Sequence, residues 1–189
     1  MKKIVIFASG SGSNAEKIIL HFNKKECKNV FEIFTNNPNA KVLEKATILN
    51  ISTQVFNKQD LNEGVVLEKL NKINPDLIVL AGFLLKFPAD IVSKYPNKII
   101  NIHPALLPNY GGKGMYGMHV HQAVLENKEK ETGITIHYVN ENYDEGEFIF
   151  QKSVNIEDCK SAVEIADKIH VLEHQYFPEV IEKFLSRNS

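Results

Sequence analysis

Residues 3–14 read KIVIFASGSGSN, and this stretch decides the fold that the sequence predicts. Its apolar run from Ile4 to Ala8 is rich in β-branched residues and predicts a buried strand. The glycine-rich turn Ser9-Gly10-Ser11-Gly12 follows at once, and the residues from Asn14 to Lys25 have helix-compatible spacing. A strand, a tight turn and a helix in this order indicate a fold in which strands and helices alternate along the chain.

The alternation continues through the first half of the chain. Further apolar runs rich in β-branched residues occur at Val30 to Thr35, Leu77 to Ala81 and Ile99 to Ile102. Between them, the segments Lys41 to Leu49 and Asp60 to Asn74 again have helix-compatible spacing. Strands that alternate with helices form parallel sheets that are covered on both faces. The sequence therefore predicts an α/β fold, with a Rossmann-like, mostly parallel twisted sheet and helices on both faces.

The last third of the chain departs from this pattern. Gly133 to Val139 and Phe148 to Val154 read as two strands joined through the turn signal Asp144-Glu145-Gly146, so we expect this part of the sheet to be mixed. A final helix is predicted from Ser161, its expected N-cap, to Arg187. Because no repeat, low-complexity tract or linker interrupts the chain, we expect residues 1–189 to form a single domain.

The composition favours a small-molecule substrate. Lys and Arg number 22 against 23 Asp and Glu, so the net charge of −1 provides no field that would draw the protein to nucleic acid or to an anionic membrane. The two cysteines, Cys27 and Cys159, form no C-x-x-C pair, which argues against a disulfide framework and a zinc site. We expect a cytoplasmic protein, because the run from Ile4 to Ala8 is too short for a signal peptide and no segment could span a bilayer.

The turn after the first strand is a candidate phosphate site. It would place glycines, hydroxyls and free backbone N–H groups at a helix N-terminus, and this geometry binds anions. An ordinary tight turn capped by Ser13 or Asn14 would have a similar sequence. The turn is not a Walker loop, because no Gly-Lys-Ser/Thr follows, and it lacks the third glycine of a dinucleotide fingerprint. A phosphomonoester is therefore the ligand that this turn favours.

A polar constellation occupies the carboxyl end of the fourth predicted strand, where open α/β sheets place their ligands. Asn101 and His103 are two residues apart in an extended segment, so both project to the same side. An Asn amide can donate a hydrogen bond to a developing oxyanion, and a His can provide a proton near neutral pH. Alternatively, both residues only satisfy backbone groups at a strand end before Pro104. Asp144 is the candidate third partner, since a carboxylate next to an imidazole favours its charged form.

Three further patterns bear on the chemistry. Neither a Gly-x-Ser-x-Gly elbow nor a reactive-cysteine signature is present, which favours direct attack by a bound amine over a covalent acyl-enzyme. The pair His119-x-His121 lacks further ligands, so we expect no metal site. The glycines from Gly111 to Gly117 predict either a mobile lid over the site or a plain surface connector.

Taken together, these motifs closely resemble the phosphoribosylglycinamide formyltransferase family, and the likeness spans nearly the whole chain. The motifs that carry it are Ser9-Gly10-Ser11-Gly12-Ser13-Asn14, Leu80-Ala81-Gly82-Phe83, Asn101-Ile102-His103-Pro104-Ala105-Leu106-Leu107-Pro108, and Asp144. The third string is typical of folate-dependent formyltransferases in general, whereas the Gly-Ser-Asn loop and Glu173-His174 point to the branch that acts on glycinamide ribonucleotide. The resemblance implies the formyltransferase fold, and transfer of a formyl group from 10-formyltetrahydrofolate to the amino group of that ribonucleotide in purine biosynthesis.

The resemblance also implies roles for individual residues. It places the substrate phosphate at Gly12, Ser13 and Asn14. It places the ribosyl-glycinamide portion at Glu173 and the neighbouring turn, namely His170, Val171 and Leu172. It implies a folate pocket lined by Leu84, Leu85, Lys86 and Phe87, and by Asn140, Glu141, Asn142, Tyr143 and Asp144. At the reacting centre it implies that Asn101 contacts the formyl group, that His103 is the general acid, and that Asp144 raises the His103 pKa.

The sequence departs from the family pattern in two places. Family members often carry a basic residue directly after the Ala-Gly-Phe string, but here Leu84 and Leu85 come first and Lys86 follows. The segment from Asn109 to Met118 is longer than the usual Pro-Gly-x-His connection. Side-chain contacts to the folate and the role of this loop therefore stay open.

Three other functions compete with this one. A formyltransferase that acts on charged initiator tRNA usually adds a C-terminal nucleic-acid-binding domain, for which we expect no room in 189 residues. An enzyme that hydrolyses formyltetrahydrofolate usually carries an additional N-terminal domain, whereas the predicted sheet begins at Lys3. A non-enzymatic nucleotide-binding module would leave Asn101, His103 and Asp144 unexplained. We therefore expect small-molecule partners without nucleic acid or a membrane, with a homodimer as one option for the assembly.

Overall fold

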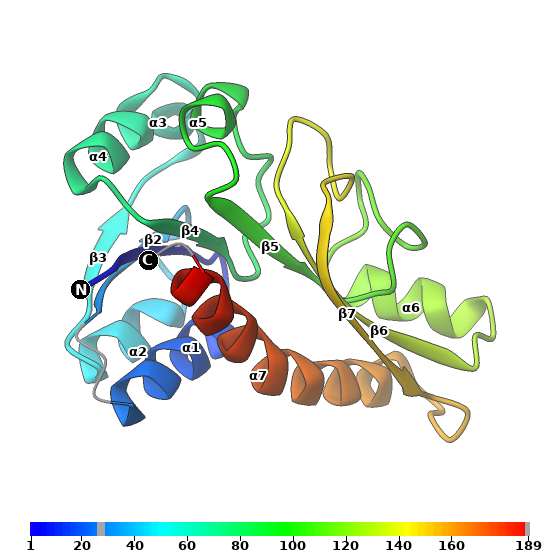
Figure 1. The fold of residues 1–189 in the computed structure, drawn as a ribbon. Coiled ribbons are helices and arrows are strands. Elements are labelled where there is room, and N and C mark those ends of the chain that lie inside the picture. Colours follow the sequence, from blue (N-terminus) through cyan, green and yellow to red (C-terminus); the bar gives the residue numbers. More distant parts are fainter. Residues whose placement is uncertain (26–28, 188–189) are drawn as a thin grey trace.

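The computed structural model describes residues 1–25 and 29–187, so that Cys27 lies outside the described residues. Its centre is a seven-stranded sheet in the order β3-β2-β1-β4-β5-β6-β7 (Figure 1). The strands are β1 (Lys3–Phe7), β2 (Val30–Thr35), β3 (Ser52–Val55), β4 (Leu77–Leu80), β5 (Ile99–His103), β6 (Glu131–Tyr138) and β7 (Phe148–Asn155). Strands β1 to β5 are parallel, whereas β6 is antiparallel to both β5 and β7. The predicted α/β class and the mixed later part of the sheet are confirmed.

Helices cover both faces of this sheet. They are α1 (Ser13–Lys24), α2 (Val42–Ile48), α3 (Lys58–Asn62), α4 (Val65–Ile73), α5 (Ala89–Lys94), α6 (Met118–Glu126) and α7 (Ala162–Arg187). One hydrophobic core joins the sheet to α1, α2 and α7, and a second core joins it to α3, α4 and α5 on the opposite face (Figure 1). Side chains of β1 alternate between them, since Ile4 and Ile6 enter the first core, and Val5 and Phe7 the second.

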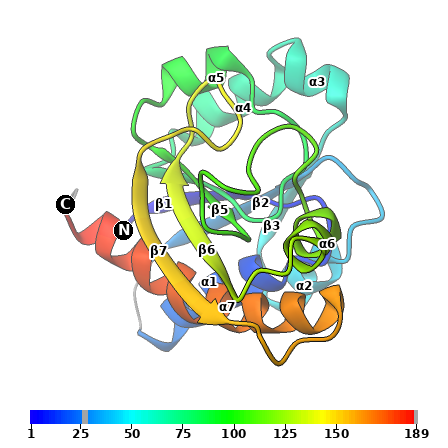
Figure 2. The ribbon, with the colours of Figure 1, turned by 90° about the vertical axis from the view of Figure 1, so that its right-hand side faces the viewer.

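The strand order sets the position of the ligand crevice. The chain passes from β1 to β2 on one side of β1, and β4 then pairs with β1 on the other side. In open α/β sheets, ligands bind outside the carboxyl ends of the strands at such a switch point. The motifs at residues 9–14, 80–83 and 101–108 stand at or directly after the carboxyl ends of β1, β4 and β5, so these three motifs lie at this edge. Figure 2 looks onto the side of the sheet that ends in the edge strand β7, where β6 and β7 run side by side.

Several elements differ from the sequence prediction. The single helix predicted from Asp60 to Asn74 is wrong, because Gly64, with a φ of 86°, separates α3 from α4. Asn57 starts α3 with a capping box, in which its Oδ1 accepts a hydrogen bond from the backbone N–H of Asp60 at 2.9 Å. The sequence patterns do not predict β3, α5 or α6. All three are short, and β3 consists largely of exposed residues, so it lacks the apolar run of a buried strand.

Helix α7 carries the chain along the sheet and back to the crevice. It begins as predicted, because the Oγ of Ser161 accepts a hydrogen bond from the backbone N–H of Glu164 at 3.3 Å. Its 26 residues pack against α1 and α6, and they place Glu173 beside the start of α1. Within residues 1–25 and 29–187, α7 and the other helices are too short or too polar to cross a membrane.

The connection between β6 and β7 packs closely on its own strand. An ideal Cβ built at Gly146 would lie 1.7 Å from the main-chain oxygen of Tyr138, which leaves no room for a side chain. Tyr138 N also donates a hydrogen bond to the main-chain oxygen of Glu147 at 2.9 Å. Asp144, two residues before Gly146, adopts a left-handed backbone conformation with a φ of 56°. This tight turn therefore sets the position of Asp144.

We predict that Gly146→Ala lowers the free energy of unfolding by about 1–3 kcal/mol, because the added methyl group forces the backbone of β6 or of the turn to move. Gly10→Ala is the matched control, since a Cβ there meets nothing within 4 Å. Urea unfolding monitored by circular dichroism measures both changes. Wild-type stability in Gly146→Ala would contradict the close packing of this turn.

Candidate active site

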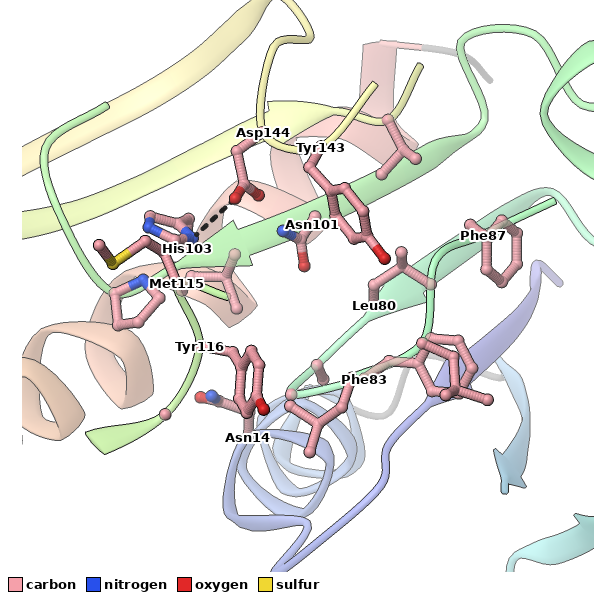
Figure 3. Close-up of a pocket in the computed structure, with 18 of the residues that line it drawn as sticks. Asn14, Leu80, Phe83, Phe87, Asn101, His103, Met115, Tyr116, Tyr143 and Asp144 are labelled. Carbon is pink, nitrogen blue, oxygen red and sulfur yellow. Dashed lines mark ion pairs between the residues drawn. The ribbon is translucent and has the colours of Figure 1, made fainter. Parts of the chain in front are cut away.

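A cavity of about 600 Å³ opens at the carboxyl ends of β1, β4 and β5 (Figure 3). It is lined by residues 10–14, 80–87, 101–104 and 112–117, by parts of 137–144, and by His121, His170 and Glu173. The volume falls within the range of small-molecule sites, roughly 300–1,000 Å³. The predicted phosphate loop and the predicted polar constellation therefore belong to a single cavity.

The loop after β1 presents the N-terminus of α1 to this cavity. Gly12 is the N-cap residue, with a φ of 68°, and it has no side chain to cap the first-turn N–H groups. A Cβ at Gly12 would lie 2.3 Å from Cγ2 of Val42, so the packing of α2 also requires glycine here. Uncapped N–H groups and the positive end of the helix dipole favour an anion. Ser13 and Asn14 line the cavity next to Gly12, so the three predicted phosphate ligands lie together.

Asn14 and Glu173 connect α1 to α7 at this end of the cavity. Asn14 Nδ2 donates a hydrogen bond to Glu173 Oε2 at 2.9 Å, and both side chains are buried. Burial raises the pKa of Glu173, while the hydrogen bond from Asn14 and the charge of His170 oppose this shift. Asn14 Oδ1 is also buried and has no hydrogen-bond partner among the described residues. The pair thus holds polar atoms that a ligand hydroxyl or amide can satisfy.

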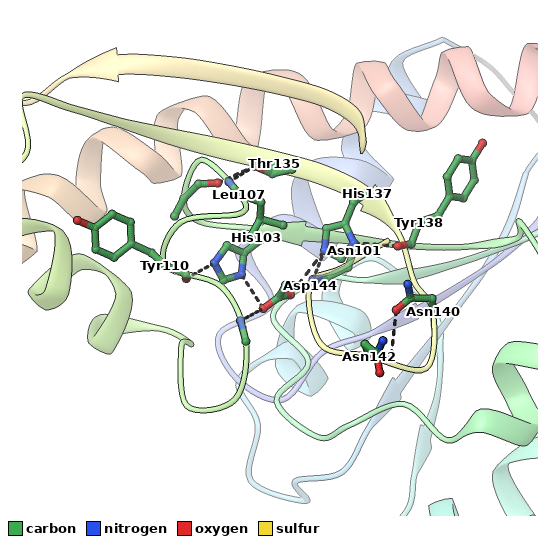
Figure 4. A network of polar contacts seen from close by, with 12 residues as sticks. Asn101, His103, Leu107, Tyr110, Thr135, His137, Tyr138, Asn140, Asn142 and Asp144 are labelled. Atoms are coloured by element: carbon green, nitrogen blue, oxygen red, sulfur yellow. Dashed lines mark hydrogen bonds and ion pairs between the residues drawn. The ribbon is translucent and has the colours of Figure 1, made fainter. Parts of the chain in front are cut away.

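His103 is held on both sides of its ring (Figure 4). Its Nδ1 lies 3.5 Å from Oδ2 of Asp144, and its Nε2 lies 2.7 Å from the main-chain oxygen of Tyr110. Asp144 Oδ2 also accepts a hydrogen bond from the backbone N–H of Gly112 at 2.9 Å. The side chains of His103 and Asp144 are only 4% and 12% exposed. The structure therefore brings together the imidazole and the carboxylate that the sequence predicts to be partners.

Asn101 precedes His103 by two residues on strand β5 and lines the same cavity (Figure 3). Its Nδ2 lies 3.2 Å from Nε2 of His137, and Nδ1 of His137 lies 2.8 Å from the main-chain oxygen of Tyr138. A carbonyl oxygen only accepts hydrogen bonds, so Nδ1 of His137 carries a hydrogen. Its Nε2 lies between Asn101 and the Asp144 carboxylate, 3.6 Å from Oδ1, and accepts from Asn101 only when the imidazole is neutral. This contact uses one of the two amide hydrogens of Asn101 and leaves the other for a ligand.

Burial and Asp144 act on the pKa of His103 in opposite directions. Burial is the larger effect and lowers the pKa, whereas the Asp144 charge and the hydrogen bond to the Tyr110 carbonyl raise it. The net pKa of His103 therefore lies below its ordinary value, although Asp144 acts in the expected direction. For Asp144, burial raises the pKa, but contacts with His137, His103 and the Gly112 N–H together outweigh it, and the net pKa is lowered.

The loop between β5 and α6 lies against the site. Residues 112–117 line the cavity, and Gly112, Gly114 and Gly117 have φ values of 94°, 92° and 53°, which glycine adopts most readily. Through Tyr110 and Gly112 the start of this loop bonds to both members of the His-Asp pair. A purely solvent-exposed connector would not make these contacts. Closure of the loop over ligands stays a prediction.

Two further segments line the cavity and meet each other. Residues 84–87 follow β4, and residues 140–144 precede β7. Lys86 Nζ lies 5.8 Å from the ring centroid of Tyr143, and this contact joins the two segments. Glu141 does not line this cavity, in contrast to its predicted folate neighbours. It lines a smaller cavity of about 310 Å³ that also touches Lys86 and Asn142.

Two residues of the predicted ribosyl contact lie away from the cavity. Val171 is 64% exposed, and Leu172 is buried in the hydrophobic core. His170 and Glu173, by contrast, both line the cavity. The predicted turn is in fact part of helix α7, and residues three apart share a helix face while the residues between them point elsewhere.

His137 and His121 line the cavity although the sequence motifs give neither of them a substrate contact. His137 lies opposite Asn101 in the pairing of β5 with β6, a relation that requires knowledge of the sheet order. His121 lies on α6, and burial is the main cause that lowers its pKa to about 4. Among the residues that the structure describes, no three His, Cys, Asp or Glu side chains are grouped so that they could hold a metal ion.

Comparison with known proteins connects this fold and site to formyl transfer. The formyl transferase family model matches residues 2–181. The phosphoribosylglycinamide formyltransferase of Bacillus subtilis is 34% identical, over 100% of this chain and 97% of its own length. That of Escherichia coli is 33% identical, over 96% of this chain and 86% of its own length. The chloroplastic relative of Arabidopsis thaliana is 35% identical over 95% of this chain, which spans 64% of that protein.

Solved structures agree with the sequence comparison. The crystal structure of phosphoribosylglycinamide formyltransferase from Bacillus halodurans superposes with a TM-score of 0.89, at 33% identity, and covers 100% of this chain and 97% of that one. The corresponding structure from Streptococcus pneumoniae has a TM-score of 0.86 at 30% identity, and the match covers 98% of this chain and 99% of that one. The chain therefore belongs to the formyl transferase family. These full-length relatives are named as the enzymes that act on phosphoribosylglycinamide, which confirms the resemblance seen in the sequence.

We predict that Glu173→Gln raises the free energy of unfolding near pH 7 and leaves it unchanged well below pH 4. A carboxyl whose pKa is raised by folding stabilises the folded state below its unfolded pKa of about 4.3, and this contribution is lost as the pH rises through the folded pKa. Denaturant unfolding over a pH series measures the effect. A loss of stability near pH 7 would contradict the dominance of burial over the Asn14 hydrogen bond.

Glu182 provides a control of opposite sign. Hydrogen bonds from Lys25 and His21 lower its pKa, so its contribution is present above the unfolded pKa and is lost as the pH falls through the folded one. Glu182→Gln should therefore lower the free energy of unfolding near pH 7 and have no effect in acid.

Proposed function

We propose that this chain is a phosphoribosylglycinamide formyltransferase. It transfers the formyl group of 10-formyltetrahydrofolate to the amino group of glycinamide ribonucleotide, which gives N-formylglycinamide ribonucleotide and tetrahydrofolate in de novo purine biosynthesis. The observation that carries the proposal is a single cavity with an anion-binding helix N-terminus at one end and Asn101, His103 and Asp144 beside it. The family match and the full-length relatives support it.

The polar end of the cavity suits the ribonucleotide. Its phosphate would accept hydrogen bonds from the first turn of α1, at Gly12, Ser13 and Asn14. Beside that turn, Asn14 Oδ1 and the carboxyl group of Glu173 are buried polar atoms that can bind the ribosyl hydroxyls. His170 lines the same wall and is close enough to oppose the raised pKa of Glu173.

The opposite end of the cavity suits the folate. Residues 84–87 and the cavity-lining residues of 140–144, which exclude Glu141, would hold it between them. The rings of Phe83 and Phe87 support the first segment through edge contacts with Phe7. Lys86 adds a positive charge beside Tyr143, which suits the carboxylates of the folate tail. The folate supplies the formyl group and is a co-substrate, and the proposal involves no metal.

The reaction joins the substrate amine to the formyl carbon and breaks the bond between that carbon and the folate nitrogen. Negative charge develops on the formyl oxygen, and the unused amide hydrogen of Asn101 can bind it. The amine loses one proton and the folate nitrogen gains one, so a group that holds a proton between them balances the reaction. We assign this role to His103, because it lines the cavity beside Asn101 and the Asp144 charge partly offsets the lowering of its pKa by burial.

We further propose that residues 1–189 act as one catalytic domain in the cytoplasm, on small molecules and without nucleic acid or a membrane. The net charge of −1 and the single sheet support this proposal. For the assembly, we propose a homodimer as one option beside the monomer. Light scattering measures the mass in solution and so distinguishes a dimer from a monomer.

We predict that the purified protein formylates glycinamide ribonucleotide, and transfers no formyl group to charged initiator tRNA or to water. Asn101→Ala and His103→Ala should each lower kcat by about 10²–10³ without loss of the fold, as is typical for removal of one oxyanion donor. Gln59→Ala, which removes only an exposed contact to Glu63, should keep wild-type turnover. Release of formate without an acceptor amine, transfer to tRNA, or near-unchanged turnover in either folded site variant would contradict the proposal.

We predict that Asp144→Asn moves the basic limb of the kcat profile to lower pH. The Asp144 charge raises the pKa of His103, so its removal lets the imidazole lose its proton at a lower pH, and activity that needs the protonated form then falls off earlier. Steady-state rates across a pH series measure the limb. A basic limb that stays in place in Asp144→Asn would separate Asp144 from the protonation of His103.

A further inference from the structure

Tyr110 connects the active-site histidine to a distant part of the surface. Its main-chain oxygen lies 2.7 Å from Nε2 of His103. Its hydroxyl group donates a hydrogen bond to Glu129 Oε1 at 2.6 Å and accepts one from Asn127 Nδ2 at 2.9 Å. Glu129 and Asn127 lie just beyond the end of α6, so one residue bonds to the catalytic imidazole at its main chain and to this region at its side chain.

The main chain of Tyr110 is in a conformation that needs outside support. Its φ is 58°, in the left-handed region that residues other than glycine rarely adopt. Such a conformation persists only where surrounding contacts impose it. The two hydrogen bonds of the phenol are side-chain contacts that can do so, since they fix the far end of the same residue. Directly after Tyr110 the glycine-rich segment begins, and on that side the main chain is held by the hydrogen bond from the Gly112 N–H to Asp144, so the phenol provides the anchor on the side-chain end of the residue.

The contact between Tyr110 and His103 also decides which ring nitrogen carries a hydrogen. A carbonyl oxygen has no hydrogen to donate, so Nε2 of His103 must be the donor. Nδ1 is then the nitrogen that faces Asp144, and it is the one that gains or loses a proton as the imidazole titrates. This orientation turns the titrating nitrogen toward the carboxylate, away from the protein backbone.

We propose that Tyr110 is a positioning residue for His103: its phenol, fixed by Glu129 and Asn127, holds its main-chain carbonyl on Nε2 and so leaves Nδ1 as the nitrogen that gains and loses the titrating proton. The consequence for turnover rests on the proposed function, whereas the consequence for the imidazole does not. The other titratable groups near His103 are Asp144 and His137 from the connection after β6 and from β6 itself, and His121 from α6. The carbonyl of Tyr110 acts with Asp144, since both raise the pKa of His103.

The test is nitrogen NMR of the histidine side chains in the free protein over a pH series, with the His103 signals assigned by their loss in His103→Gln. In the wild type, neutral His103 should carry its hydrogen on Nε2. Tyr110→Phe keeps the main-chain carbonyl but removes the hydroxyl, so we expect a mixture of the two tautomers, a lower His103 pKa, and a fall in kcat of about threefold to tenfold at unchanged KM. Gln122→Ala removes an exposed contact to Glu126 on α6 and should leave all of these readouts unchanged.

A second pair of variants separates positioning from charge. Glu129→Gln keeps an acceptor for the phenol and should preserve the wild-type tautomer and titration, whereas Glu129→Ala should resemble Tyr110→Phe. A wild-type tautomer and titration in folded Tyr110→Phe would overturn the proposal. So would equal shifts in Glu129→Gln and Glu129→Ala, because the cause would then be the lost charge. Because the NMR readout needs no turnover, it decides the positioning role even where the protein transfers no formyl group.

Discussion

The carboxylate of Asp144 joins strand β5, the loop that follows β5, and strand β6. Its Oδ2 accepts the Gly112 N–H and faces His103 at the end of β5, while its Oδ1 lies 3.6 Å from Nε2 of His137 on β6. A buried carboxylate without such partners would be costly, so each of these segments must stay in place for the charge to be tolerated. The close packing of Gly146 on β6 keeps the carboxylate at this point.

Two buried carboxyl groups at the same cavity are tuned in opposite directions. Asp144 has two imidazoles and a backbone N–H near it, and its net pKa is lowered despite burial. Glu173 has one hydrogen bond, from Asn14, and burial dominates, so its pKa is raised. The cavity thus has a carboxyl group with a lowered pKa beside the proposed reacting centre and one with a raised pKa beside the proposed ribosyl site. The opposite directions of these two pKa shifts distinguish the proposed reacting centre from the proposed ribosyl site.

The sequence predicts what local patterns encode. The apolar runs define most strands, and the motifs after β1, β4 and β5 meet in one cavity because parallel strands end at the same edge. Contacts that depend on which strands pair cannot be predicted from local patterns. His137, for example, reaches the site because β6 pairs with β5, and no sequence motif marks it. The placement of residues 170–173 on a helix face, and not in a turn, likewise removes Val171 and Leu172 from the cavity. The balance between burial and charge at His103 also depends on packing that no spacing reveals.

The most direct test of the central claim is a crystal structure with glycinamide ribonucleotide and a non-reactive 10-formyl folate analogue bound together. We expect the phosphate on the first-turn N–H groups of α1, and the formyl oxygen about 3 Å from Asn101 Nδ2, on the same side as Nδ1 of His103. The folate should lie between residues 84–87 and 140–144. A phosphate bound elsewhere, or a formyl oxygen out of reach of both Asn101 and His103, would contradict the account.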